Sequence, residues 1–155
     1  LGGQHMTANK LAKLQITGKS DSGLKSSINV RDLPPFIVDE PERLGGTNQG
    51  PNPLEYLLGA LSGCTSIIIA YVAKEQSFTY DGVEFATDGE LDPRGFQGAD
   101  GVLTYFQTVT INVTVNTNED NEKLASLKET VEKRCPLFNL LKDAGVKVES
   151  NWRRK

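Results

Sequence analysis

Apolar residues recur along this chain with two different periods, which separate the expected strands from the expected helices. Within residues 104 to 117 the apolar positions alternate strictly with Thr and Asn, through Val109, Ile111, Val113 and Val115. Such alternation is typical of a strand with one buried face. Further strands are expected at residues 12 to 18, 24 to 30, 36 to 40 and 82 to 91, and finally through Val146, Val148 and Trp152.

The first helix is expected from about Pro53 to Gln76, after a loop rich in Gly, Asn and Pro. At 100° per residue, one apolar stripe of this helix contains Leu57, Leu61, Cys64 and Ile68. The same helix contains the small residues Gly59, Ser62 and Gly63. Glycine costs about 1 kcal/mol relative to alanine in a helix, so these residues indicate that another segment must approach closely here.

A second helix is expected to begin near Asn118, which is a favourable N-cap residue. Its apolar stripe contains Leu124, Leu127, Val131 and Cys135. Pro136 interrupts this helix, and a shorter helical segment continues to Ala144 before Gly145 ends it. Together the elements predict an α+β domain in which two helices pack on a mainly antiparallel sheet.

The composition predicts one soluble globular domain. The chain has 155 residues, of which 37% are hydrophobic and 24% charged, and a net charge of −3. Scattered Lys and Arg residues in an acidic chain argue against a nucleic-acid partner. The longest apolar stretch, around Ile67 to Val72, is short for a membrane span, and no signal segment opens the chain, so no membrane partner and a cytoplasmic location are expected. Residues 1 to 6, "LGGQHM", read as vector-derived, which leaves a single domain over residues 7 to 155.

The chemistry of this chain therefore falls to its cysteines. His5 is the only histidine, and without it neither Cys–His or Ser–His catalysis nor a histidine-rich metal site is possible. Cys64 and Cys135 lie 71 positions apart and form no C-x-x-C motif, so no zinc site is expected. They are either two unrelated buried thiols or a pair that meets in space.

The neighbourhood of each cysteine favours a cooperating pair. Because a residue before proline is disfavoured in the α region, Cys135 should lie at the start of the helical segment that Pro136 begins. Free N–H groups there, together with the charges of Lys133 and Arg134, predict a lowered pKa for Cys135. Both cysteines thus lie on apolar stripes beside a backbone irregularity.

Three segments of the chain resemble the OsmC/Ohr superfamily of osmotically inducible and organic hydroperoxide resistance proteins. They are "DEPERLGGTNQGPNPLEYLLGALSGCTS" at 39 to 66, "GELDPRGFQG" at 89 to 98 and "VEKRCPLFNLLKDAGVKVE" at 131 to 149. The resemblance implies an OsmC-like fold and an intertwined homodimer with two active sites. It also implies a thiol peroxidase without cofactor or metal, which reduces organic hydroperoxides and is itself reduced by a dithiol, for example of lipoyl type. By position, Cys64 matches the peroxidatic cysteine and Cys135 the resolving one.

The resemblance further implies an arginine that supports the peroxidatic thiolate and a glutamate that orients the arginine. Arg31 is the first candidate for the arginine and Arg43 the second. The family reads N-P-E before the helix, whereas here Leu54 stands in the expected place and Glu55 follows one step later. One step turns the side chain by about 100°. Glu55 therefore serves the site only if the first turn bends or if it acts on the partner chain; otherwise it complements the helix dipole.

Two functions remain open from the sequence. The first is a peroxidase that forms a sulfenic acid on Cys64 and resolves it with Cys135. The second is a non-enzymatic OsmC-like dimer that binds a small apolar ligand or senses redox state. Retention of both cysteines favours the first function, and the displaced glutamate favours the second.

Replacement of Arg31 by methionine tests the predicted arginine. Arg31→Met should slow alkylation of Cys64 at neutral pH roughly tenfold, because a neutral side chain does not stabilise the thiolate. The rate is measured with iodoacetamide and mass spectrometry, with Arg43→Met as the matched variant. An unchanged rate in Arg31→Met, with slow alkylation in Arg43→Met, would transfer the role to Arg43.

Overall fold

The chain forms two compact units, one up to Glu55 and the other from Tyr56 to Lys155. The structure, a computed structural model, describes residues 10–155. Residues 1 to 6, expected to be vector-derived, and His5 among them, lie outside the described residues. The single domain expected over residues 7 to 155 stays a prediction.

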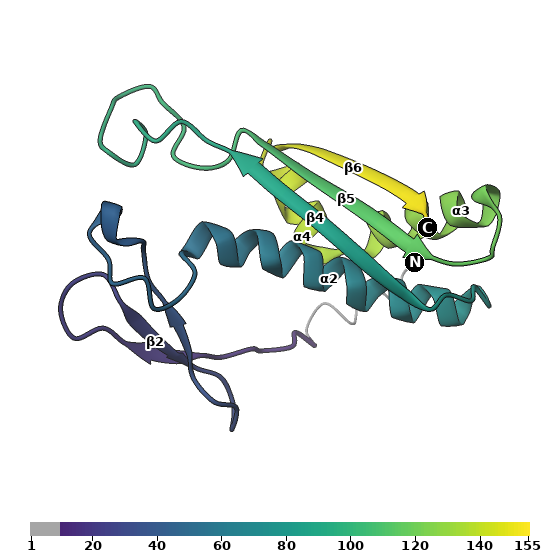
Figure 1. Cartoon of the computed structure of the whole chain (residues 1–155), viewed down its shortest axis with the longest axis horizontal. Helices are drawn as coiled ribbons and strands as arrows, with labels where there is room; N and C mark the ends of the chain where they lie inside the picture. The colour runs from purple at the N-terminus through teal and green to yellow at the C-terminus, as the bar shows by residue number, and fades with distance from the viewer. Residues whose placement is uncertain (1–9) are drawn as a thin grey trace. The chain divides into compact units, whose positions relative to one another are not determined.

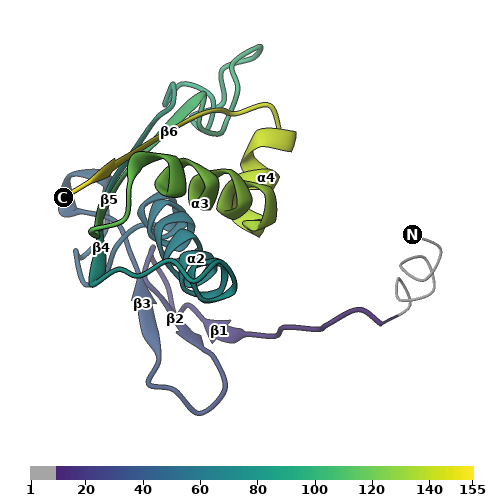
Figure 2. The ribbon, with the colours of Figure 1, turned by 90° about the vertical axis from the view of Figure 1, so that its right-hand side faces the viewer.

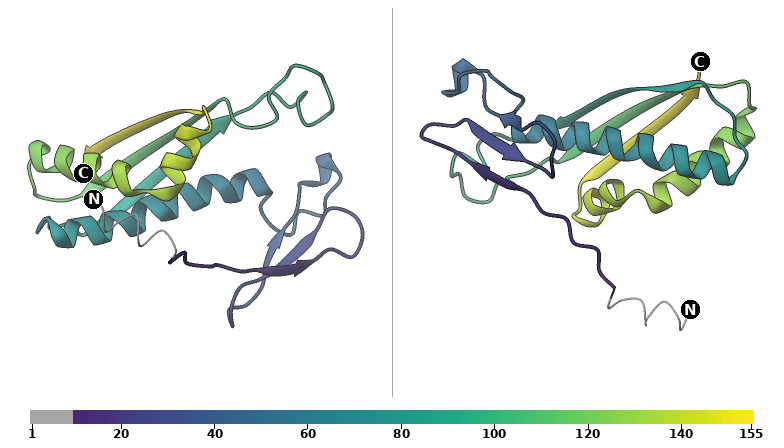
Figure 3. Two further views of the ribbon diagram at one scale, coloured as in Figure 1. Left: turned by 180° about the vertical axis from the view of Figure 1, so that it is seen from behind. Right: turned by 90° about the horizontal axis from the view of Figure 1, so that it is seen from below.

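The first unit contains a three-stranded antiparallel sheet with the order β1-β2-β3 (Figure 3). Its strands are β1 (Thr17–Lys19), β2 (Ser26–Asn29) and β3 (Phe36–Val38). All three are shorter than expected, and β1 begins only at Thr17, opposite Asn29. The partner strand ends there because the chain turns at Arg31, which has a φ of 50°. Residues 12 to 16 therefore have no ladder partner on β2.

A buried carboxylate organises the loop after β3, which includes the short 3-10 helix η1 (Glu42–Leu44). Asp39 is only 1% exposed. Its carboxylate accepts hydrogen bonds from the backbone N–H groups of Glu40 (2.8 Å), Thr47 (3.3 Å) and Gln49 (3.1 Å), and from the Thr47 hydroxyl (2.6 Å). These donors, the Thr47 hydroxyl first, lower the pKa of Asp39 to about 2 against the opposing effect of burial. Gly46 is required in this loop, because a Cβ there would lie 2.0 Å from the carbonyl oxygen of Glu40.

The second unit contains a mixed three-stranded sheet with the order β4-β5-β6 (Figure 1). Its strands are β4 (Gly82–Glu90), β5 (Thr108–Asn116) and β6 (Lys147–Arg154). β4 pairs with β5 antiparallel, and β6 pairs with β5 in parallel. The alternation predicted for β5 is confirmed, since its four apolar residues are at most 1% exposed: Val109, Ile111, Val113 and Val115. Only the ladder between β5 and β6 is parallel, because two helices connect these strands.

Helices cover one face of this sheet, as Figure 2 shows for α2 and α3. They are α2 (Pro53–Glu75), α3 (Asn121–Arg134) and α4 (Pro136–Asp143). The expected N-cap of α3, Asn118, is wrong. Asp120 caps the helix instead and accepts a hydrogen bond from the backbone N–H of Lys123 at 2.8 Å. The break at Pro136 and the end before Gly145, which has a φ of 91°, are as expected.

The buried stripe of α2 is rotated relative to the expected one. Its buried residues are Leu61, Thr65, Ile69, Val72 and Ala73, and Cys64 lies at the edge of this stripe. The opposite face is apolar yet exposed, with Ile67 at 56% and Tyr71 at 59%. By length and composition, α2 is apolar enough to cross a membrane. One helix of this kind is weak evidence for a membrane span, and 28% of its most apolar window is buried.

The Asp39 carboxylate should stabilise the first unit in a pH-dependent way. Its pKa is lowered from 3.8 to about 2, so its contribution is present above about pH 4 and is lost as the pH falls toward 2. Asp39→Asn should therefore lower the thermal midpoint at pH 7, and should flatten the acid dependence between pH 4 and pH 2. Circular dichroism melts measure both effects, with the exposed Asp88→Asn as the control. Equal melting curves for Asp39→Asn and the control would contradict this role.

Candidate redox site

The two cysteines of the chain meet in the second unit. The Sγ atom of Cys135 donates a hydrogen bond to the Sγ atom of Cys64 at 3.3 Å. Both thiols are free. A disulfide bond is about 2 Å long, so the two sulfurs lie a little over 1 Å further apart than bonded sulfurs do. The expectation that the cysteines form a pair in space agrees with this geometry.

Cys135 reaches this position because it lies between two helices. It is the C-cap of α3 and the N-cap of α4, with extended backbone angles of φ −77° and ψ 114°. Its backbone N–H still bonds the Val131 carbonyl at 2.9 Å, and the Phe138 backbone N–H donates to its sulfur at 3.5 Å. Pro136 disfavours the α conformation in the residue before it, which is the local cause of the break.

The pKa of Cys135 is raised, so the expected lowering is wrong. Burial is the main cause, since the side chain is only 1% exposed. The Phe138 N–H lowers the pKa, but the hydrogen bond to Cys64 raises it further. The positive charge of Arg134 is directed elsewhere, because its guanidinium pairs with Glu75 at 2.7 Å.

Cys64 lies in the middle of α2 and is half-buried. The helix is fixed to the sheet beside it, because the Ser62 hydroxyl lies 2.7 Å from the Thr87 hydroxyl on β4 and donates to the Leu58 carbonyl. A Cβ added at Gly63 would meet no atom within 4 Å, and the same holds at Gly59. The sulfur thus lies at the boundary between the packed face of α2 and its exposed apolar face.

Glu55 has a structural role at the start of α2. Its Oε1 accepts a hydrogen bond from the Asn52 backbone N–H at 2.9 Å, and its own backbone N–H donates to Asn52 Oδ1 at 2.8 Å. This reciprocal pair is a capping box, which satisfies two N–H groups at the helix start. The sequence pattern Asn-x-x-Glu was the available signal for it. A catalytic role for Glu55 stays a prediction.

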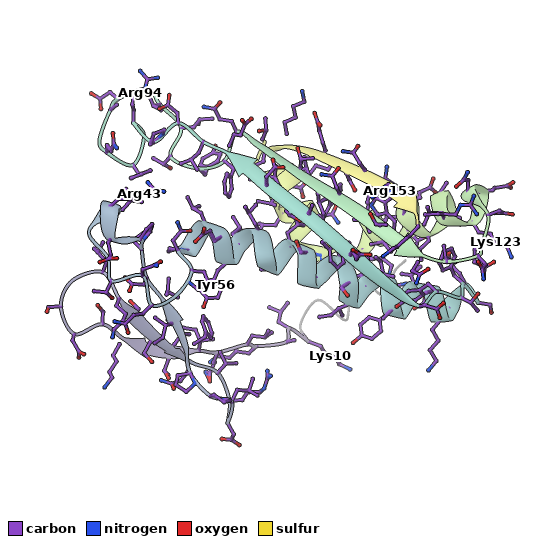
Figure 4. The ribbon with its side chains drawn as sticks, viewed as in Figure 1. Lys10, Arg43, Tyr56, Arg94, Lys123 and Arg153 are labelled. Atoms are coloured by element: carbon purple, nitrogen blue, oxygen red, sulfur yellow. The ribbon has the colours of Figure 1, made fainter. Side chains whose placement is uncertain are left out.

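The two candidate arginines belong to the first unit. Arg31 follows β2 and has a positive φ of 50°, an uncommon conformation for a non-glycine residue. Arg43 lies in η1, and Figure 4 labels its side chain. Their relation to Cys64, which belongs to the second unit, stays a prediction.

Asn139 is a residue of this region that the sequence analysis did not single out. Its Nδ2 atom donates to the carbonyl oxygens of Cys135 (2.8 Å), Glu132 (2.9 Å) and Lys133 (3.3 Å). The available signal was an amide residue four positions after the cysteine and three after a proline that lacks an N–H group. Among residues 10–155, no three His, Cys, Asp or Glu side chains are grouped so that they could hold a metal ion.

The fold and the contacting cysteines define a small α+β protein with a thiol pair, and comparison with known proteins gives the family. Residues 46–151 match the family model described as OsmC-like protein, so the chain belongs to the OsmC-like family. No curated protein sequence matches the chain.

Solved structures of the same family share the fold at low sequence identity. The OsmC-like protein from Mycoplasma pneumoniae superposes with a TM-score of 0.78 at 18% identity, covering 92% of this chain and 97% of that one. An organic hydroperoxide resistance protein from Elizabethkingia anophelis gives a TM-score of 0.72 at 18% identity, covering 94% and 98%. The organic hydroperoxide resistance protein OsmC from Legionella pneumophila gives 0.68 at 17% identity, with the same coverage of 94% and 98%. These likenesses confirm the predicted α+β, OsmC-like fold.

Proposed function

We propose that the chain is a thiol peroxidase that reduces organic hydroperoxides with Cys64 and Cys135. The observation that carries this proposal is the 3.3 Å separation of the two sulfurs. Membership of the OsmC-like family, which includes organic hydroperoxide resistance proteins among its solved structures, supports the substrate class.

In the proposed reaction, Cys64 is oxidised first. Its thiolate attacks the distal oxygen of the hydroperoxide, the O–O bond breaks, and the alkoxide leaves and takes up a proton. The product is a sulfenic acid on Cys64. Half-burial gives Cys64, rather than the buried Cys135, access to a substrate. The apolar side chains beside Cys64 on α2 suit the organic part of such a substrate.

Cys135 then resolves the sulfenic acid. Its sulfur attacks the Cys64 sulfur, hydroxide departs and leaves as water with the Cys135 proton, and a disulfide forms. A dithiol, for example of the lipoyl type that the resemblance implies, reduces this disulfide by two successive thiol exchanges and is itself oxidised. The residues proposed to assist Cys64 are Arg31, with Arg43 as second candidate, and Glu55 if it is released from its capping box.

A homodimer is part of the proposal. The α2 face that contains Gly59, Gly63, Ile67 and Tyr71 is apolar, contiguous along the helix and exposed in the single chain. Large exposed apolar patches mark interaction sites, and glycines without neighbours permit a second backbone to approach. A second copy of the chain is the occupant that the family resemblance implies. The OsmC-like domain is a soluble one, so we attribute the exposed apolar face of α2 to this interface rather than to a membrane. A cytoplasmic location is part of the same proposal.

The capping role of Glu55 favours a second candidate function. One of its carboxylate oxygens, Oε1, accepts from the Asn52 backbone N–H, so only the other oxygen remains to orient an arginine in this conformation. A dimer that lacks this support could bind an apolar molecule or sense redox state without turnover. The two candidates differ in whether hydroperoxide is consumed.

Hydroperoxide should join the two cysteines. One equivalent of tert-butyl hydroperoxide should consume both thiols and give an intramolecular disulfide, because the sulfurs are already in contact. Cys64→Ser should abolish peroxide consumption. Cys135→Ser should still allow one oxidation, but the unresolved sulfenic acid should advance to sulfinic acid under excess peroxide. Thiol counting and mass spectrometry measure these products. If the unmutated protein still has two free thiols after this treatment, the peroxidase proposal is wrong and the binding or sensing function takes its place.

Light scattering at micromolar concentration should give a dimer. Ile67→Asp should dissociate it, because an unpaired carboxylate would be buried in the apolar interface. Leu140→Asp is the matched control, since Leu140 is similarly exposed at 61% but lies on α4. A folded monomer of the unmutated chain would refute the dimer, and a dimer that survives Ile67→Asp would exclude this face.

A further inference from the structure

We propose that Asn139 is a positioning residue for the resolving step, and that it holds Cys135 where its sulfur can reach Cys64. This inference rests on the proposed function. The amide of Asn139 acts through backbone carbonyl groups, those of Cys135 itself and of the last turn before it.

The need for Asn139 follows from Pro136. In a continuous helix the N–H of residue 136 would bond the carbonyl of Glu132, and the N–H of residue 137 would bond that of Lys133. Pro136 has no N–H, and residue 137 already lies in the first turn of α4. The two hydrogens of Asn139 Nδ2 are shared among three carbonyl oxygens, which include these two, Glu132 at 2.9 Å and Lys133 at 3.3 Å.

The same amide also fixes Cys135 itself. Its Nδ2 donates to the Cys135 carbonyl at 2.8 Å, and the Asn139 backbone N–H bonds the same carbonyl at 3.1 Å. A single side chain on α4 therefore ties Cys135 to the last turn of α3. That turn is itself anchored, because Val131 is buried and Arg134 pairs with Glu75 on α2.

Loss of this tie should affect the two oxidation steps unequally. Cys64 lies on α2, whose hydrogen bonds do not involve Asn139, so attack on hydroperoxide does not depend on it. Disulfide formation does, because the two sulfurs must close from 3.3 Å to about 2 Å in the correct orientation. Freedom at the α3–α4 junction lowers the fraction of time that Cys135 spends in that orientation.

The test compares the two steps in Asn139→Ala. Alanine is a good helix former, so α4 itself should persist. The rate of Cys64 oxidation should change less than about twofold, whereas disulfide formation should slow by roughly tenfold, an effect expected of misplaced reacting groups. Dimedone trapping and mass spectrometry should accordingly show more sulfenic acid, and more sulfinic acid under excess peroxide.

Two further variants separate positioning from general stability. Asn139→Gln keeps the amide donor on a longer side chain and should recover part of the resolving rate. Asn151→Ala removes an amide of β6 that donates to Asn112 at 3.1 Å, and should leave both steps unchanged. Equal slowing of both steps in Asn139→Ala, or an unchanged ratio of disulfide to sulfinic acid, would overturn the proposal.

A second measurement does not depend on peroxidase activity. In a glutathione redox buffer, the Cys64–Cys135 disulfide forms by thiol exchange with oxidised glutathione, which is reduced to two glutathione thiols. Asn139→Ala should lower the equilibrium constant for this closure by roughly tenfold, which corresponds to about 30 mV. Failure of hydroperoxide to oxidise the unmutated protein would remove the peroxidase proposal alone, whereas an unchanged closure constant in Asn139→Ala would remove the positioning role.

Discussion

The contact between the two sulfurs depends on a missing backbone donor. Helix α3 ends at Arg134, two residues before Pro136, and Cys135 takes an extended conformation between the two helices. If the helix continued through this point, the side chain of Cys135 would follow the regular stripe of Leu127 and Val131. The break instead places its sulfur 3.3 Å from that of Cys64, on a different helix. The break leaves the carbonyl groups of Glu132 and Lys133 without helical donors, and the amide of Asn139 donates to both.

Burial divides the two cysteines chemically. Cys135 is almost completely enclosed, and its raised pKa keeps it as a thiol at neutral pH. A neutral, enclosed thiol is a poor target for oxidants, but Cys135 lies beside the Cys64 sulfur with which it is proposed to react. Cys64 is half-buried and so remains accessible from solvent. This asymmetry agrees with the order of oxidation proposed for the two residues.

Helix α2 has one face in the core of the second unit and another that is apolar and exposed. One face packs on the sheet through Leu61, Ile69 and Val72, and the Ser62 hydroxyl contacts Thr87 on β4. The other face presents Ile67 and Tyr71 to solvent beside two glycines whose missing Cβ positions are empty. A helix that is apolar on all sides while one face lies open is unusual in a monomer, because about 25 cal/mol is forgone for each Å² of apolar surface left in water. The proposed dimer would cover the exposed apolar side chains and fill the space beside the two glycines.

The sequence alone determined the period of each element and the position of the break between the last two helices. Three features follow from local pattern, since each depends on the backbone preference and polarity of adjacent residues: the alternation of β5, the apolar stripe of α3 and the end of α3 before Pro136.

Local pattern failed where contacts with a distant segment determine the structure. The pattern predicted Asn118 as the N-cap of α3. In the structure the carboxylate of Glu119 accepts a hydrogen bond from the Thr79 backbone N–H, and the helix begins after Asp120. It predicted a lowered pKa for Cys135 because the free N–H groups are visible in sequence. Burial, which outweighs them, is produced by the packing of helices and sheet. The 3.3 Å contact between the sulfurs of Cys64 and Cys135 also requires this packing, because the local break at Pro136 positions only one of the two cysteines.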